Sequence, residues 1–245
     1  MKKLALVILC LLACTATFAQ EDGKEKLEEL EKAILDGDGL RITSKNKVVC
    51  LDFLNHIGWG AHVVTSKDFD PWRGHSGEAF LNLFCVKINP TKWFGLDLGC
   101  DFGFQYFMSK EQFFTRDADA KVVITPFTAF GLGFDEKRST LSNVRFSFPA
   151  LLDFKIDKFS IGLGAEATLN FGGDASYKYE AGYQKLNSEM SGVDVNLFTW
   201  DAIAIVSYYK LGVLFKYRPA SVQVYPGNNP YPKMSFWTIG AILGF

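Results

Sequence analysis

One short segment matches a cofactor-binding fingerprint. Residues 162–167 read Gly-Leu-Gly-Ala-Glu-Ala, which is the G-x-G-x-x-A spacing of dinucleotide-binding proteins. That chemistry needs a strand that turns into a helix, because the helix N-terminus must face the pyrophosphate. Here the alternation of apolar and polar residues continues unbroken to Phe171, which predicts a strand through the whole motif. We therefore reject a nucleotide site and expect no cofactor.

Metal or nucleophilic chemistry would have to use the three histidines, His56, His62 and His75. On one strand, His56 and His62 would lie roughly 20 Å apart at about 3.3 Å per residue, too far to share a metal. His62 and His75 could approach each other, but single polar side chains account for them better. A hydrolase needs a Ser, a His and an acid in contact, and Ser66 and Ser76 carry no G-x-S-x-G signature. We expect no metal, no catalytic residue and no enzyme.

The third candidate for a functional site is a set of single charged residues that recur with a two-residue period. They share the polar face of predicted strands, opposite a face of bulky apolar residues. If that polar face is enclosed, unpaired charges on it would cost several kcal/mol each, so we expect ion pairs and a few trapped waters. The predicted interior network consists of Asp52, Asp97, Asp101, Arg145, Asp153, Lys155, Glu166, Asp201, Lys216 and Arg218.

Eight segments could position these charges, because each alternates apolar and polar residues. The clearest are residues 94–108 and 159–171, where Phe, Leu, Ile and Ala alternate with Gly, Asp, Ser and Glu. Residues 49–62, 144–156, 198–208, 211–218 and 235–245 follow the same rule less cleanly. The least regular is 79–88, where Leu81, Leu83 and Cys85 would share the apolar face but Phe80, Phe84 and Val86 interrupt. The sequence predicts an all-β protein of eight antiparallel strands.

The composition of the two faces indicates which one points inward. The chain is 15% aromatic with 23 Phe, and it also contains 22 Gly. A water-soluble barrel or sandwich would place the apolar residues inside, but bulky rings would overfill a small barrel. Glycines and paired charges would fit that interior, which leaves the rings outside in lipid. We therefore predict a transmembrane β-barrel with a filled lumen.

The connections alternate strictly between short and long. Tight turns are expected at 89–92, 157–158 and 209–210, whereas 62–78, 109–143, 172–197 and 219–234 are long. Outer-membrane barrels have short periplasmic turns and long external loops, so both chain ends are expected on the periplasmic side. Residues 122–134 resemble a further strand, but nine strands would break the even count and Pro126 cannot donate to a ladder. We read them as a loop above the membrane, with ten strands as the alternative.

The N-terminus reads as a targeting segment. Lys2 and Lys3 precede an apolar run that closes at Thr17-Phe18-Ala19, which predicts a secretory signal peptide over 1–19. A lipoprotein box at 11–14, which would make Cys14 a lipid-anchored N-terminus, is the alternative. A periplasmic leader over 20–45 with a short charged helix at 24–35 would follow, and the barrel would occupy 46–245. The near-neutral formal charge of −1 argues against nucleic-acid binding.

Over residues 46–245 the pattern resembles the small eight-stranded outer-membrane β-barrel family, similar to OmpX and the membrane domain of OmpA. The most specific element is the alternating final segment from Trp237, which ends at Phe245. The resemblance implies that Phe245 serves as the assembly signal recognised by the barrel-assembly machinery. It also implies residence in the outer membrane of a Gram-negative bacterium, in contact with lipid and lipopolysaccharide.

The function expected from these features is a structural or surface-interaction role. The alternatives are a narrow pore for small solutes and, third, a lipid-modifying outer-membrane enzyme. The long connections carry mixed charge, so they identify no extracellular ligand.

Overall fold

The computed structural model describes residues 41–43, 48–64, 75–127, 136–181, 184–219, 224–225 and 235–244. The predicted signal peptide, the leader helix at 24–35 and the terminal Phe245 lie outside these residues. None of the described residues forms a helix that is long and apolar enough to cross a membrane.

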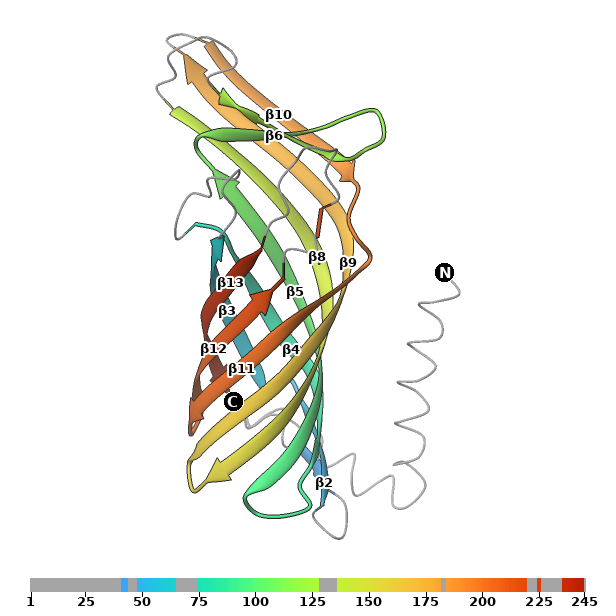
Figure 1. The fold of residues 1–245 in the computed structure, drawn as a ribbon, viewed down its shortest axis with the longest axis vertical. Helices are drawn as coiled ribbons and strands as arrows, with labels where there is room; N and C mark the ends of the chain where they lie inside the picture. The colour runs from blue at the N-terminus through green and yellow to red at the C-terminus, as the bar shows by residue number, and fades with distance from the viewer. Residues whose placement is uncertain are drawn as a thin grey trace, which may run out of the picture. The chain divides into compact units, whose positions relative to one another are not determined.

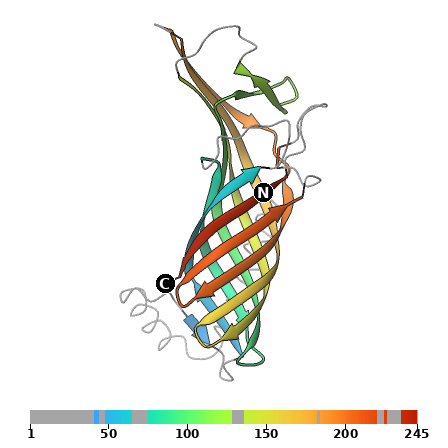
Figure 2. The ribbon, with the colours of Figure 1, turned by 60° about the vertical axis from the view of Figure 1, so that its left-hand side comes forward.

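Eight antiparallel strands form a closed barrel (Figures 1 and 2). They are β3 (His56–Val64), β4 (Gly77–Ile88), β5 (Phe94–Ser109), β8 (Glu136–Ile156), β9 (Phe159–Ala181), β11 (Phe198–Tyr208), β12 (Leu211–Arg218) and β13 (Phe236–Gly244). Each strand pairs with its neighbours in the chain, and β13 pairs with β3 to close the ring. The predicted all-β, eight-stranded antiparallel architecture is confirmed, as is the closed small barrel that the family resemblance implied.

The first wall strand is broken in two. β2 (Val49–Phe53) and β3 both pair with β4, one with each half of it. Between them, Leu54 has a φ of 47°, in the left-handed region that a leucine rarely adopts. β1 (Arg41–Thr43) pairs with the other edge of β2. The segment predicted as one strand over 49–62 is therefore two strands separated by a kink.

A β-bulge explains the irregular pattern in β4. Asn82 pairs with Asp101 and Phe84 pairs with Cys100, so Leu83 has no partner in the register. One extra residue reverses the faces beyond it. Cys85 lies directly opposite the buried Asp52 and is itself 6% exposed. The prediction that Cys85 shares the outer face with Leu81 is therefore wrong.

Two of the long connections contain strands. β8 and β9 remain paired from the turn at 157–158 as far as Glu136 and Glu180, and β10 (Gln184–Val193) adds to β9. β6 (Gln112–Arg116) and β7 (Val122–Pro126) form a separate hairpin. The prediction of loops throughout 109–143 and 172–197 is thus wrong for these parts. Because β7 pairs only with β6, the wall has neither nine nor ten strands.

The barrel is apolar outside and polar inside. Large apolar side chains on alternate positions of the wall are exposed, including Trp59, Phe104, Leu152, Leu163, Trp200, Phe215 and Ile239. Charged and amide side chains on the intervening positions are buried, among them Glu78, Arg145, Glu166 and Lys216. The predicted direction of the two faces is borne out for these residues, except for Glu78, which lay outside the predicted strands.

Candidate functional site

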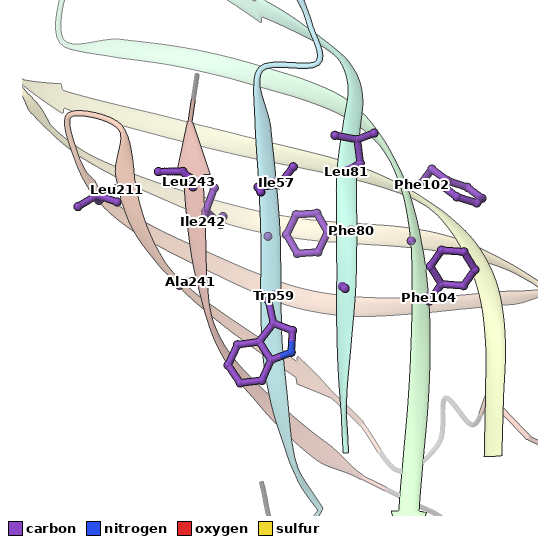
Figure 3. A pocket seen from close by; sticks show the side chains of 13 residues that line it. Ile57, Trp59, Phe80, Leu81, Phe102, Phe104, Leu211, Ala241, Ile242 and Leu243 are labelled. Carbon is purple, nitrogen blue, oxygen red and sulfur yellow. The ribbon is translucent and has the colours of Figure 1, made fainter. Parts of the chain in front are cut away.

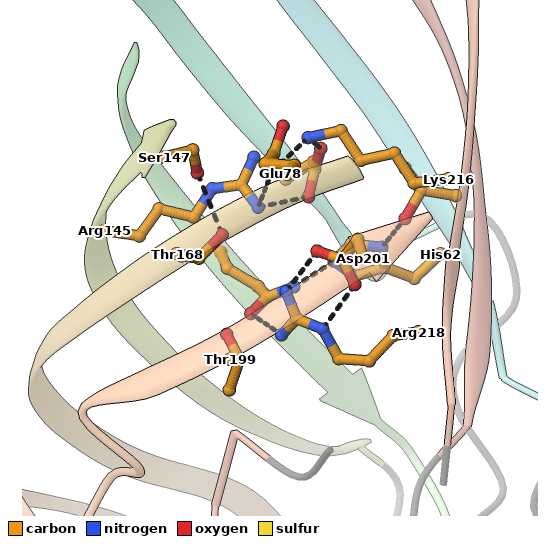
Figure 4. A network of polar contacts seen from close by, with 12 residues as sticks. His62, Glu78, Arg145, Ser147, Thr168, Thr199, Asp201, Lys216 and Arg218 are labelled. Carbon is orange, nitrogen blue, oxygen red and sulfur yellow. Dashed lines mark hydrogen bonds and ion pairs between the residues drawn. The ribbon is translucent and has the colours of Figure 1, made fainter. Parts of the chain in front are cut away.

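Four charged side chains from four strands meet in the lumen. Figure 4 labels three of them, Glu78, Arg145 and Lys216. Arg145 Nη1 on β8 lies 2.7 Å from Glu78 Oε2 on β4 and 3.7 Å from Glu166 Oε1 on β9. Lys216 Nζ on β12 lies 2.7 Å from Glu78 Oε1 and 2.8 Å from Glu166 Oε1. Each cation thus faces both carboxylates. The four side chains bridge the lumen from wall to wall.

A second ion pair lies beside this group. Arg218 on β12 binds Asp201 on β11 through both branches of its guanidinium, with Nε 2.6 Å from Oδ1. Gln105 accepts a weaker bond from Arg218 and contacts Nε2 of His62 through its amide nitrogen at 3.1 Å. Since an amide nitrogen can only donate, Nε2 accepts and Nδ1 carries the proton that His62 shares with Thr238 Oγ1. The histidine is therefore a neutral link in this chain.

These six charges, named here the central charged cluster, balance one another. The carboxylates of Glu78, Glu166 and Asp201 face the cations of Arg145, Lys216 and Arg218, and none of the six residues is more than 3% exposed. Buried charges persist only when paired and hydrogen-bonded. Nε and Nη2 of Arg145 and Oε2 of Glu166 have no hydrogen-bond partner among the described residues. Polar sites of this kind are where buried water is expected.

An inner apolar layer lies between the central charged cluster and the tight turns. It consists of Phe80, Leu151, Ile203 and Leu214. Lys216 Nζ lies 5.0 Å from the centre of the Phe80 ring, so the layer also contacts the charges. The ring lies against Gly58, where an added Cβ would come within 2.1 Å of it. Any larger residue at position 58 would therefore force the Phe80 ring to shift.

Smaller polar contacts occupy the turn end of the lumen. Lys87 lies 2.9 Å from Asp52, and Lys155 lies 3.0 Å from Asp153. Lys155 also donates to Asn89 at 2.7 Å. The lysine side chains of these pairs are 23% and 29% exposed, unlike those of the central charged cluster.

The opposite mouth is closed by an apolar cluster, named here the mouth cap. It joins residues of the wall, of the β6–β7 hairpin, of β10 and of the β12–β13 connection: Phe107, Phe114, Val122, Leu141, Ala175, Val193, Val224, Tyr225 and Phe236. Tyr225 donates to Asn143 Oδ1 at 2.8 Å. Burial, with the nearby Asp174, raises the pKa of this hydroxyl well above its ordinary value, which keeps it a donor.

The ten predicted network residues all lie on lumen-facing positions, but they form several separate groups. Five of them belong to the central charged cluster, where Glu166 faces Arg145 and Lys216, and Asp201 pairs with Arg218. Asp153 pairs with Lys155, whereas Asp52 pairs with Lys87, which the prediction did not include.

Asp97 and Asp101 have no lysine or arginine within ion-pair distance in the described part of the chain. Asp101 accepts a 2.7 Å hydrogen bond from Asn82 and lies 4.0 Å from His56 Nε2. Asp97 has one buried carboxylate oxygen without a hydrogen-bond partner among the described residues. The lumen pairs most of the predicted charges but not all of them.

Glu78 is the most important residue that the prediction missed. It sits at the edge of a segment expected to be a loop, yet it contacts both central cations. The alternation of Glu78, Phe80 and Asn82 with Ala79 and Leu81 carries the two-residue period back to this position. That signal could have found it.

Fold and site together define a closed eight-stranded antiparallel barrel with an apolar exterior and a lumen filled by paired charges. No protein-family model matches the chain, and no curated protein matches it. The chain is similar to two solved structures of Ail, the attachment invasion locus protein of Yersinia pestis, one of them in complex with the heparin analogue sucrose octasulfate. The identities are 11% and 10%, and the TM-scores are 0.33 and 0.32. Each match covers 80% of this chain and 97% of the Ail chain.

Proposed function

We propose that this protein is an integral β-barrel of a bacterial outer membrane with a structural or surface-interaction role and a sealed lumen. The observation that carries the proposal is the exposed apolar belt of the barrel. Leu152, Leu163, Phe215 and Ile239 are between 41% and 50% exposed around its circumference. Soluble proteins rarely expose apolar patches of this extent, because apolar surface in water is unfavourable by about 25 cal/mol per Å². A bilayer removes that cost.

The belt has an edge on the side of the long connections. On β8 and β9 the outward residues are apolar up to Val144 and Phe171, and beyond them come Ser142, Asp174 and Ser176. At the other end, the exposed Trp93 and Tyr209 stand at the tight turns. Aromatic residues favour both interfaces of a membrane barrel, and polar residues follow outside it. These limits support a spanning orientation with the tight turns in the periplasm.

The paired extensions of β8, β9 and β10 and the β6–β7 hairpin would then lie outside the cell. They are built from hydrogen-bonded strands rather than from irregular loops, so they present a fixed surface. This geometry favours a surface-interaction role. We propose no catalytic step, since the central acids and bases are committed to ion pairs.

The filled lumen favours a sealed barrel over a narrow pore. Three different obstructions follow one another: the inner apolar layer, the central charged cluster and the mouth cap. An eight-stranded barrel has an interior just wide enough to be filled by side chains. We therefore expect single-channel conductance at the baseline of the bilayer.

Gel migration of the detergent-folded protein tests the proposal. An integral barrel stays folded in unboiled detergent and shifts its migration on boiling, and the native protein should fractionate with the outer membrane. If boiling changes nothing and the protein is recovered soluble from the periplasm, the proposed function is wrong. Planar-bilayer recordings on the same sample separate a sealed barrel from a pore.

A further inference from the structure

The outer surface of the barrel contains a groove of about 720 Å³, named here the wall groove (Figure 3). It crosses β3, β4 and β5 and reaches β13 and the start of β12. Its volume falls within the range of small-molecule sites.

Small residues make the groove. Ala79 on β4 and Ala241 on β13 are outward positions where most of the belt carries large side chains. Trp59 and Phe104, about half exposed, stand on either side of Ala79. Behind the floor, the Phe80 ring packs against Gly58 from the lumen, so the wall is thin here but closed. The groove is therefore a fixed feature of the wall.

The lining selects a hydrocarbon ligand. Side chains of Ile57, Leu81 and Leu243 complete the groove, and none of them can donate or accept a hydrogen bond. Its end at the tight turns is different. Leu211 pairs with Leu243 there, and the preceding residue is the exposed Lys210. Lys158 belongs to the adjacent tight turn, where its carbonyl accepts from the N–H of Tyr209 and its Nζ lies 5.9 Å from the Tyr209 ring. A hydrocarbon slot that ends at lysines fits an amphiphile with an anionic headgroup.

We propose that the wall groove binds one acyl chain of a glycerophospholipid, with the phosphate of that lipid beside Lys210. The proposal rests on the proposed function, which places the tight turns at the periplasmic face and hence the ligand in the inner-facing leaflet. A second copy of the chain fits less well. In a two-fold dimer the same patch meets itself, and two facing grooves would enclose a void rather than pack.

Native mass spectrometry of the purified, detergent-solubilised barrel tests this inference. The probe is dipalmitoyl phosphatidylglycerol, added after the copurified lipid has been exchanged for detergent. We expect one lipid bound per wild-type barrel. Ala79→Phe and Ala241→Phe each fill the groove and should weaken binding at least about tenfold. Ala202→Phe, which changes an exposed outward alanine on β11, is the matched control and should bind like wild type.

A Lys210→Glu variant tests the headgroup. It should weaken binding of phosphatidylglycerol several-fold, yet leave binding of the uncharged dipalmitoylglycerol unchanged. Using two groove variants guards against failure of one to fold, and gel migration on boiling reports folding for each.

Three results would overturn the inference. They are no lipid on a folded wild-type barrel, equal binding by all variants, and native protein that carries lipopolysaccharide in place of phospholipid. In each case the folded barrel would still shift on boiling, so the proposed function would stand. Loss of that shift in the wild type would instead refute the proposed function.

Discussion

At the scale of single residues, the lumen depends on counter-charges that come from other strands, most of them across the lumen. Arg145 and Lys216 reach the same two carboxylates from opposite sides, so removal of one acid leaves both cations with a single partner. An uncompensated buried charge is far more costly than the pair that held it. Glu78, Arg145, Glu166 and Lys216 are therefore stable only as a group of four.

Replacement of Glu166 by Leu tests this dependence. The substitution leaves Arg145 and Lys216 to share Glu78, and loss of one buried partner typically costs about 3–5 kcal/mol. The midpoint of the heat-induced gel shift should fall clearly, while planar-bilayer conductance stays at baseline. Glu189→Leu, at an exposed position of β10, is the control and should change little. A large rise in single-channel conductance for Glu166→Leu would contradict the sealed lumen.

The Asp201–Arg218 pair allows a double-mutant cycle. Asp201→Leu and Arg218→Met should each destabilise the barrel by about 3–5 kcal/mol, because each leaves one buried charge alone. The double variant should recover most of that loss, since apolar residues of similar volume can replace a buried pair. The three denaturant midpoints in detergent give the coupling energy. Additive losses would mean that the two residues act independently.

Single residues also show which features of the lumen could be predicted from the sequence alone. Strict alternation predicted a shared inner face for the ten charges, because a strand puts every second side chain on one face. The ion-pair partner of each charge was harder to predict, because it depends on the register between strands. Lys87 joins Asp52 only because the bulge at Leu83 returns Lys87 to the lumen. No local pattern marks that extra residue.

At the scale of elements, β8 shows most clearly where the apolar belt that would face the membrane ends. Its outward positions run from Ile156 to Val144 as apolar residues and turn polar at Ser142. The strand was predicted to end near residue 144, where the alternation of apolar and polar residues ends. β8 continues to Glu136 because β9 runs beside it as far as Glu180 and supplies backbone hydrogen-bond partners. Backbone pairing of this kind needs no apolar face. For this reason the periodicity of the sequence underestimated the lengths of β8 and β9.

Lysine substitutions on β8 locate the edge of the belt. Leu152→Lys places a charge on an outward position in the belt and should cost about 2–4 kcal/mol near the bilayer midplane. Ser142→Lys lies past the edge on the same face and should cost little. Folding yields into phosphatidylcholine vesicles compare the two. Equal yields would show that the belt does not face lipid.

The β6–β7 hairpin is held to the barrel by buried rings of the mouth cap. Phe114 is fully buried there, and its backbone N–H donates to Ser139 Oγ at 2.9 Å. Phe114→Ala removes a buried ring, a change that typically costs about 3–5 kcal/mol. We expect faster protease cleavage within the hairpin but an unchanged gel shift on boiling, because the wall does not depend on it. Asp119→Ala, at an exposed turn position, should leave cleavage as in wild type.

Loss of the boiling shift in Phe114→Ala would contradict that separation. It would mean that the hairpin and the wall fold as one cooperative unit.

At the scale of the whole barrel, the three obstructions act in series. The inner apolar layer, the central charged cluster and the mouth cap are built from different residues at successive heights, although most wall strands contribute to more than one of them. Conduction through such a lumen requires every obstruction to open, since the narrowest one limits flow. This arrangement also accounts for glycines on the inner face, which leave room for long charged and aromatic side chains.

A series arrangement predicts that variants of one layer stay closed. Phe80→Ala with Leu214→Ala should lower stability by about 2–5 kcal/mol per residue without raising conductance, because the charges and the mouth cap remain. Phe107→Ala with Phe236→Ala should behave alike at the other end. Only a barrel that combines both pairs with alanine at all six positions of the central charged cluster should conduct, provided that it still shifts on boiling. Planar-bilayer recordings of the three proteins test this prediction. If a variant of a single layer conducts, the layer that it removes is by itself the seal of the lumen.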